Sequence, residues 1–195
     1  MIALIDCNNF FVSCERLFRP DLQHQPVAVL SSNDGCIVAR SDEVKKIGIP
    51  MGVPLFEVKD VVQKHGITLF SSNFTLYRDL SRRVMAVLCD EYRHISVYSI
   101  DEAFVTLRSG ESEDDVRRVR DRIMKHVGIP VSIGVASTHT LAKLASTYAK
   151  RGDGVFYLDS SFLRTEGASI PVGTIWGIGR EMAATLTRDG VHTLD

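Results

Sequence analysis

Cysteine is scarce in this sequence and follows no pairing pattern. Cys7, Cys14, Cys36 and Cys89 form no CxxC pair and have no histidines near them at zinc-finger spacing. A disulfide framework or a structural zinc site would need such spacings, so neither is expected. We expect reduced and mostly buried thiols.

Long hydrophobic runs are missing as well. The apolar stretches at residues 1–5 and 130–136 are far shorter than the roughly 20 residues that a membrane helix needs. No charged segment precedes the first of them and Asp6 interrupts it, so we expect no signal peptide. The sequence predicts a cytoplasmic protein with no membrane partner.

The chain also lacks an excess of positive charge. Its 23 Lys and Arg residues are balanced by 24 Asp and Glu residues, for a net charge of -1. This balance argues against a simple polyanion binder, so a nucleic-acid role must rest on local placement of charge or on sequence beyond residue 195. A chain of 195 residues that is 45% hydrophobic can bury a core of one large or two small domains.

Hydrophobic periodicity predicts alternating strands and helices. Strands are expected at residues 1–5, 25–31, 36–40, 67–71, 95–100, 103–107, 131–136 and 155–158. Helices are expected at residues 41–48, 55–65, 77–92, 112–127 and 138–150. Ser41 is suited to cap the first of these helices and Gly48 to end it. Asn33, Asp34 and Gly35 predict a hairpin turn.

The order of these elements predicts the topology. With residues 17–72 set aside as an insertion, the order is strand, helix, strand, strand, helix, strand, which is a ferredoxin-like α+β arrangement. Its third strand lies between the first and the second and is antiparallel to both. We therefore expect Asp6, at the end of the first strand, to meet Asp101 and Glu102, which form a tight turn before the third.

Such a cluster of acids predicts a metal site. Three neighbouring carboxylates repel one another unless a cation neutralises them. Oxygen ligands without histidine or thiolate favour Mg²⁺ or Mn²⁺, and the backbone carbonyl of Cys7 could add a ligand. Two ions about 3.5 to 4 Å apart would suit an in-line phosphoryl displacement.

A structural interpretation of these acids stays open. Asp6 could simply end a strand, and Asp101 and Glu102 could simply fill a turn, where Asp is common. Glu102 speaks against this alternative, because a two-residue hairpin normally takes Asn-Gly or Gly-X.

The sequence resembles the Y-family DNA polymerases and, within them, the UmuC-type catalytic subunit of DNA polymerase V. The matching stretches are DCNNFFVSCE (6–15), SNDGCIVARS (32–41), FSSNFTLYRDLSRRVM (70–85), YSIDEAF (98–104) and SIGVASTHTLAKLAS (132–146). They cover nearly the whole chain in the order found in the family. The ordered set is very specific, whereas SIDEAF alone is only moderately so.

The resemblance implies error-prone, template-directed DNA synthesis past lesions. It assigns Asp6, Asp101 and Glu102 as the carboxylates that hold two Mg²⁺ ions, for which Mn²⁺ can substitute. It assigns Phe11 as the steric gate, a ring packed where the 2′-hydroxyl of a ribonucleotide would go. The alternative for Phe11 is an ordinary core aromatic residue.

The resemblance also divides the chain into domains. Residues 1–16 and 73–164 would form the catalytic palm and residues 17–72 the small fingers domain. Lys45 and Lys150 align with basic residues that contact the nucleotide triphosphate, although a lysine near a helix end is often only solvated. Asp42 stands where many relatives have a tyrosine, and we expect this acid to point away because it would repel a triphosphate.

Residues 165–195 would begin a helix-hairpin-helix thumb. Backbone N–H groups around Gly177 and Gly179 are expected to face a DNA phosphate, the alternative being a glycine turn between two packed helices. We expect the chain to end inside this module and to lack a little-finger domain. We therefore expect weak DNA binding and weak or no synthesis by this chain alone.

The implied partners are primer-template DNA, deoxynucleoside triphosphates, a UmuD′-like subunit, a recombinase filament and a sliding clamp, with induction after DNA damage in an SOS response. Two alternative functions stay open. One is a polymerase remnant that binds DNA or repair partners without catalysis. The other is a palm-type nucleotide cyclase, since fold alone does not decide between palm chemistries.

Overall fold

The computed structural model describes residues 1–194, which divide into two compact units. The first unit comprises Met1–Asp6, Leu88–Arg122 and the described residues from Val131 onward, and the second comprises Cys7–Val87 and Ile123–Pro130. Each unit contains its own sheet. In residues 1–194, no helix is both long and apolar enough to cross a membrane.

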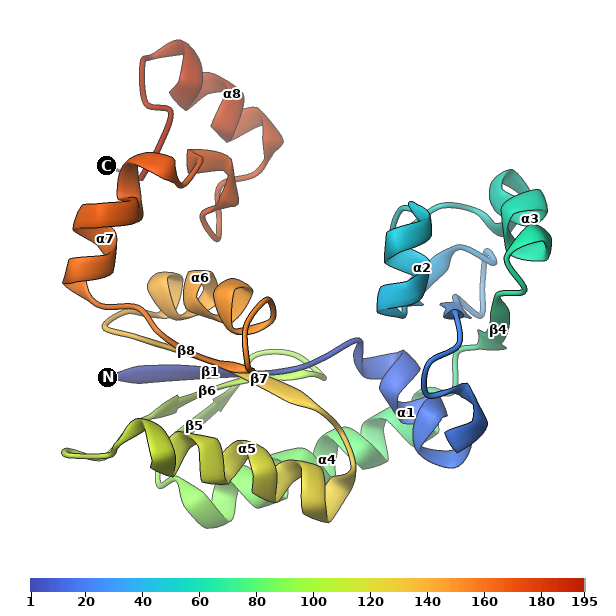
Figure 1. Ribbon diagram of the computed structural model, residues 1–195, viewed down its shortest axis with the longest axis horizontal. Helices are drawn as coiled ribbons and strands as arrows, with labels where there is room; N and C mark the ends of the chain where they lie inside the picture. The colour runs from blue at the N-terminus through green and yellow to red at the C-terminus, as the bar shows by residue number, and fades with distance from the viewer. Residues whose placement is uncertain (195) are drawn as a thin grey trace. The chain divides into compact units, whose positions relative to one another are not determined.

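The first unit is built on a five-stranded sheet with the order β5-β6-β1-β7-β8 (Figure 1). Its strands are β1 (Ile2–Cys7), β5 (Ile95–Val97), β6 (Glu102–Thr106), β7 (Val131–Ala136) and β8 (Val155–Tyr157). β6 lies between β1 and β5 and is antiparallel to both. This confirms the predicted ferredoxin-like order, to which β8 adds a strand parallel to β7.

The turn between β5 and β6 differs from the predicted two-residue hairpin. β5 already ends at Val97, and the N–H groups of Tyr98 and Ser99 both donate to the carbonyl of Glu102, at 3.0 and 3.1 Å. Residues 98–101 therefore form the bend, and Glu102 is the first residue of β6. The expectation of a strand running to residue 100 is wrong because these amides bond within the turn.

Helix α6 (His139–Ala149) covers one face of this sheet, and α5 (Glu113–Val127) begins on the other (Figure 1). The hydroxyl of Thr138 accepts a hydrogen bond from the Leu141 N–H at 3.2 Å and so caps α6. The core beneath α6 consists of Leu4, Phe104, Ala136, Ala142, Leu144, Ala145, Leu158 and Ile170. At Gly134 the strand and helix backbones approach so closely that a Cβ would lie 2.1 Å from the Ser146 nitrogen.

The second unit contains a three-stranded sheet with the order β3-β2-β4. β2 (Val27–Leu30) and β3 (Ile37–Arg40) form the predicted antiparallel hairpin, and β4 (Thr68–Ser71) runs parallel to β2. The helices are α1 (Phe10–Phe18), α2 (Asp42–Ile47), α3 (Leu55–Lys64) and most of α4 (Phe74–Glu91), with a short 3-10 helix η1 (Pro20–Leu22). Ser41 caps α2 and Gly48, at φ 94°, ends it, as predicted.

The last part of the first unit is helical. It contains α7 (Ser160–Glu166), the 3-10 helices η2 (Gly167–Ser169) and η3 (Val172–Thr174), and α8 (Arg180–Arg188). The Leu194 N–H donates to the Ile170 carbonyl at 3.0 Å, which closes the segment on itself. Ile170 also belongs to the core beneath α6, so the segment is joined to the sheet by packing.

The predicted domain boundaries do not coincide with the boundaries of the two compact units, which follow spatial contact within the chain. Helices α4 and α5 each contribute residues to both units. The assignment of palm, fingers and thumb stays a prediction.

The close approach at Gly134 makes a testable prediction about stability. Gly134→Ala should lower the free energy of unfolding by at least about 2 kcal/mol, because neither backbone can move away without disturbing a packed core. Urea denaturation followed by circular dichroism measures this loss. Gly152→Ala is the control, since its Cβ would meet nothing closer than 3.6 Å. Equal midpoints for the two variants would contradict the close packing.

Candidate active site

The pairing of β1 with β6 places two acids opposite each other. Asp6 is the direct partner of Glu102 in the antiparallel register, and directly opposed residues project from the same face of a sheet. Asp6 is only 7% exposed. This confirms that the end of the first strand meets the start of the third, although the two residues are 96 positions apart in the sequence.

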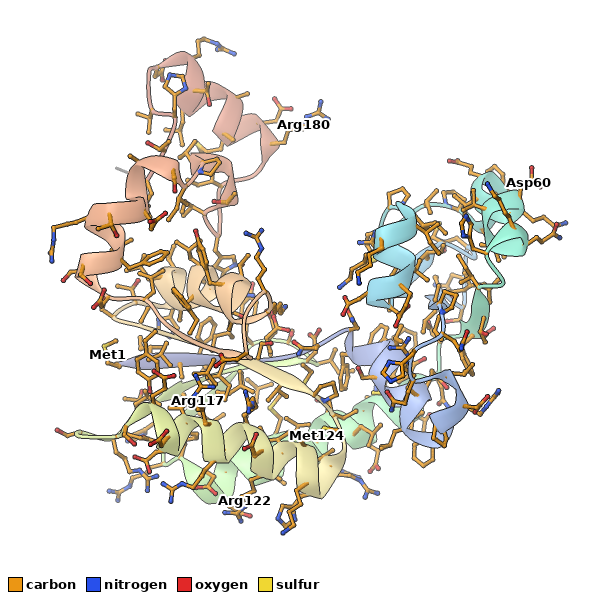
Figure 2. All side chains as sticks on the ribbon, in the orientation of Figure 1. Met1, Asp60, Arg117, Arg122, Met124 and Arg180 are labelled. Atoms are coloured by element: carbon orange, nitrogen blue, oxygen red, sulfur yellow. The ribbon has the colours of Figure 1, made fainter. Side chains whose placement is uncertain are left out.

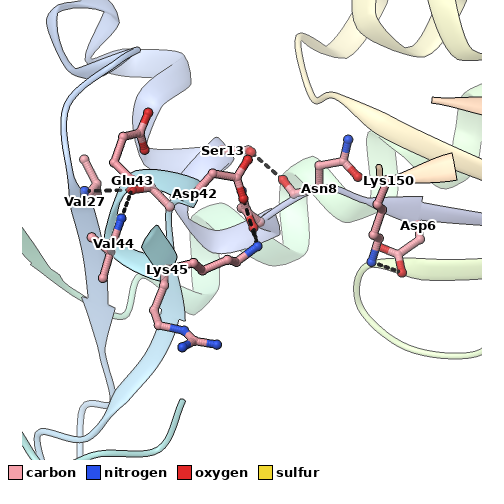
Figure 3. A network of polar contacts seen from close by, with 12 residues as sticks. Asp6, Asn8, Ser13, Val27, Asp42, Glu43, Val44, Lys45 and Lys150 are labelled. Atoms are coloured by element: carbon pink, nitrogen blue, oxygen red, sulfur yellow. Dashed lines mark hydrogen bonds and ion pairs between the residues drawn. The ribbon is translucent and has the colours of Figure 1, made fainter. Parts of the chain in front are cut away.

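Two lysines neutralise these acids. Lys150 Nζ lies 2.6 Å from Asp6 Oδ2 (Figure 3), and Lys143 Nζ lies 2.7 Å from Glu102 Oε1. Lys143 belongs to α6 and Lys150 follows its last residue. Their spacing of seven residues is two helical turns, so both ammonium groups reach the same edge of the sheet.

The pKa of Asp6 is raised to about 6 from its ordinary value of 3.8. Burial is the largest cause, because it disfavours the charged form, and the nearby Glu102 carboxylate adds to the rise. The ammonium of Lys150 acts in the opposite direction and does not cancel it. Asp6 therefore carries negative charge that its surroundings compensate only in part.

Asp101 occupies a different position from the other two acids. Its Oδ1 accepts a hydrogen bond from the Ser99 hydroxyl at 2.6 Å, and that hydroxyl accepts one from the Asp101 N–H at 3.3 Å. Within residues 1–194, no three His, Cys, Asp or Glu side chains are grouped as metal ligands. Cys7 is the last residue of β1 and is buried. The three-carboxylate site with a Cys7 carbonyl stays a prediction.

The chemistry of the Asp6 and Glu102 pair fits a divalent metal ion. Both are hard oxygen donors, which suit Mg²⁺ or Mn²⁺. Each already holds an ammonium group at less than 3 Å, in the kind of position that a metal cation would take.

Phe11 lies in the second unit, on the first turn of α1. Its half-buried ring stacks on Tyr77 with centroids 4.4 Å apart and planes 13° from parallel. Phe74 meets it edge-on at 5.9 Å. Tyr77 is fully buried, and its hydroxyl donates to Glu15 at 2.6 Å. Phe11 therefore has one face fixed by an immobile ring, and its role as a steric gate stays a prediction.

Lys45 also lies in the second unit, and its ammonium group is already engaged. Its Nζ lies 3.0 Å from Asp42 Oδ1 (Figure 3) and donates to the side-chain oxygen of Asn9. Burial raises the pKa of Asp42, but the hydrogen bonds from Asn9 and Lys45 outweigh it and hold that pKa below its usual value. Asp42 points toward Lys45 and Asn9, and its orientation relative to a bound triphosphate stays a prediction.

The two candidate DNA-binding glycines both lie just before the start of α8. Gly177 has φ 92°, a left-handed conformation that glycine adopts without strain, and Gly179 precedes the first residue of α8. Open space surrounds both positions. Figure 2 shows Arg180 at the start of this helix. Their contact with a DNA phosphate stays a prediction.

Two residues of this site were missed from the sequence. Lys143 pairs with Glu102, and Trp176 lies with its ring centroid 5.6 Å from the Lys143 ammonium. The seven-residue spacing of Lys143 and Lys150 was a usable signal for the first. No local pattern indicated the second, because the contact of Trp176 exists only in the folded chain.

Comparison with solved structures places the fold among DNA polymerases. An insertion ternary complex of Dbh DNA polymerase matches with a TM-score of 0.88 and 24% identity, over 99% of this chain and 59% of that one. A crystal structure of DinB from Sulfolobus solfataricus matches with a TM-score of 0.86 and 24% identity, over 99% and 58%. The fold of this chain is therefore the one found in these structures.

Comparison with curated sequences identifies the family. Protein UmuC of Salmonella typhimurium is 43% identical over 99% of this chain and 48% of its own length. Protein MucB of Escherichia coli is 40% identical over 100% and 48%, and DNA polymerase IV of Corynebacterium diphtheriae is 31% identical over 97% and 43%. The impB/mucB/samB family model matches residues 5–147, and the chain belongs to this family. It spans about half the length of these relatives.

The raised pKa of Asp6 predicts how stability depends on pH. Asp6 binds its proton more tightly in the folded state than in the unfolded state, so the contribution of Asp6 to the free energy of unfolding should fall as the pH rises from 3.8 to about 6. Two pKa units correspond to a contribution of up to roughly 3 kcal/mol. Asp6→Asn should lack this contribution and gain stability relative to wild type over that range.

Urea denaturation at pH 4, 5, 6 and 7 in the presence of a chelator measures the difference. Asp60→Asn is the control, because Asp60 is an exposed residue of α3 and should follow the wild-type slope. A constant difference between Asp6→Asn and wild type at all four pH values would contradict the raised pKa.

Proposed function

We propose that the protein is a template-directed, error-prone DNA polymerase that carries out nucleotidyl transfer past lesions. The observation that carries this proposal is the register that sets Asp6 against Glu102 at one edge of a ferredoxin-like sheet. The membership in the impB/mucB/samB family supports it, and so do the DNA polymerases among the relatives and structural neighbours.

In this proposal Asp6, Asp101 and Glu102, with the backbone carbonyl of Cys7, hold two Mg²⁺ ions, for which Mn²⁺ can substitute. The ions would stabilise the charge on the attacking and leaving oxygens of the transferred phosphoryl group. Ser99 supports the site, because its hydroxyl orients Asp101 at 2.6 Å and also lies 3.4 Å from Glu102 Oε2.

Lys150 and Lys45 would bind the triphosphate of the incoming nucleotide. Both side chains are partly exposed, at 44% and 45%, so their ammonium groups can exchange partners. The ion pair of Lys45 with Asp42 joins two exposed groups, and pairs of that kind are worth only about 0 to 1 kcal/mol. A phosphate oxygen with higher charge can therefore replace the Asp42 carboxylate.

Phe11 would discriminate against ribonucleotides. A steric gate must resist displacement by a hydroxyl group, and the stacked contact with buried Tyr77 supplies a rigid support on one face of the ring. The hydrogen bond from Tyr77 to Glu15 holds that support in place. The partial exposure of Phe11 leaves ring surface for contact with a sugar.

The same proposal assigns the domains and their partners. Residues 1–16 and 73–164 form the palm, residues 17–72 the fingers, and residues 165–195 the start of a thumb whose amides near Gly177 and Gly179 contact a DNA phosphate. The family resemblance implies three partners, which are a UmuD′-like subunit, a recombinase filament and a sliding clamp. In this proposal the protein acts with them in the cytoplasm during the SOS response to DNA damage.

Asp101→Ala should abolish nucleotide addition without unfolding the protein. Loss of a metal-holding carboxylate should slow addition by at least about a hundredfold, because transition-state charge is no longer stabilised. The apo fold should persist, because removing one acid relieves repulsion. Single-nucleotide extension of a labelled primer on a DNA template, with Mg²⁺ or Mn²⁺, measures the rate.

Undiminished extension by Asp101→Ala would overturn the metal assignment. If the wild-type chain bound DNA but added no nucleotide with either ion, the chain would be a binding remnant. Turnover of free nucleotide without template would instead identify a cyclase.

Phe11→Ala should admit ribonucleotides. Removal of the ring should raise the ratio of ribonucleotide to deoxynucleotide incorporation by roughly ten- to a hundredfold, the range by which pockets discriminate small groups sterically. The ratio is measured within one variant, so a general loss of stability cancels. Phe18→Ala is the control, an exposed aromatic residue at the other end of α1. Unchanged sugar discrimination in Phe11→Ala would show that the ring only packs.

A further inference from the structure

Lys143 has two kinds of partner at once. Its Nζ lies 2.7 Å from Glu102 Oε1, and it lies 4.6 Å from the ring centroid of Tyr98 and 5.6 Å from that of Trp176. All four residues belong to the first unit. The ammonium group therefore stands between a carboxylate of the candidate site and two aromatic rings.

The rings of Tyr98 and Trp176 can bind a cation. Tyr98 and Trp176 meet edge-to-face, with centroids 5.5 Å apart and planes at 88°, and both are about half exposed. An ammonium group within about 6 Å of such ring centroids is attracted by their electron-rich faces. Tyr98 begins the turn that leads to Glu102, whereas Trp176 belongs to the helical segment that precedes α8.

A divalent ion on Glu102 would compete with Lys143. Like charges this close repel one another strongly where water is partly excluded, and the Lys143 side chain is only 18% exposed. The aromatic rings already within reach offer the displaced ammonium an attractive place. Lys150 stands beside Asp6 in the same way, but within residues 1–194 it has no cation–π contact with a ring.

We propose that Lys143 is a positioning residue that serves as the resident counter-ion of Glu102 and moves onto the rings of Tyr98 and Trp176 when a divalent ion takes the carboxylate. This inference rests on the proposed function, because it requires Glu102 to bind that ion. As a consequence, the surroundings of the Trp176 ring depend on whether a divalent ion is bound at Glu102. Trp176 and Lys143 thus couple the start of the proposed thumb to the catalytic edge of the sheet.

Trp176 is the one tryptophan in the sequence, so its fluorescence reports on this contact directly. The chain is titrated with Mg²⁺ while tryptophan emission is recorded, and binding of Mn²⁺ is measured separately by electron paramagnetic resonance. In wild type, Mg²⁺ should change the emission along a single saturable curve. Lys143→Met, which keeps a long unbranched side chain without its charge, should bind Mn²⁺ roughly tenfold more tightly and show no emission change.

Two further variants separate the coupling from the loss of charge alone. Lys150→Met removes an equivalent charge beside Asp6, so it should also tighten Mn²⁺ binding but keep the emission change. Lys143→Arg keeps the charge and should keep the emission change as well. Circular dichroism verifies that each variant is folded.

The outcomes distinguish this inference from the function on which it rests. Saturable Mn²⁺ binding with no Mg²⁺-dependent emission change in wild type would overturn the role of Lys143 and leave the metal site intact. A full emission change in Lys143→Met would do the same. If folded wild-type protein bound no Mn²⁺ at all, the proposed metal site itself would be wrong, and the inference would fall with it.

Discussion

The antiparallel pairing of β1 with β6 is the constraint on which the candidate site depends. Backbone hydrogen bonds between these two central strands hold Asp6 directly opposite Glu102, whatever their side chains would prefer. Because the strands are embedded in a sheet with a packed core beneath α6, the acids cannot move apart to relieve their repulsion. The fold therefore keeps two carboxylates close together, and a nearby positive charge must offset their repulsion.

Two lysines offset this repulsion in the structure. Lys143 and Lys150 approach the acids from α6 and its end, so the helix that packs on the sheet also carries the compensating charge. The compensation is incomplete, as the raised pKa of Asp6 shows. The two acids are therefore held close together without a metal ion, because each carboxylate has an ammonium partner.

In the second unit, too, the candidate binding side chains are held in place by neighbouring groups. Phe11 is oriented by a stack on buried Tyr77, and Lys45 is held by Asp42 and Asn9. Asn9 adopts a left-handed backbone at φ 47° immediately before α1, which brings its side chain to Lys45 and Asp42. Side chains that would bind substrate are therefore already positioned by contacts inside the unit.

The sequence by itself determined the strands, the helices α2 to α6, the ferredoxin-like strand order and the meeting of Asp6 with Glu102, because periodicity and chain order restrict topology strongly. It also determined the cap of α2, which depends on the local residue Ser41. The sequence did not predict the bend at residues 98–101, because this bend depends on two amides that share the Glu102 carbonyl.

Only the tertiary structure decided which charges compensate the acids and where the Trp176 ring lies. Lys143 and Glu102 are 41 residues apart, and Trp176 is a further 33 residues along the chain. Such contacts depend on the packing of α6 and the C-terminal helical segment against the sheet. The seven-residue spacing of Lys143 and Lys150 indicates a shared helix face, but not the acids that this face meets. Side chains that are far apart in the sequence become partners only when packing brings them together, because separation along the chain does not fix distance in space.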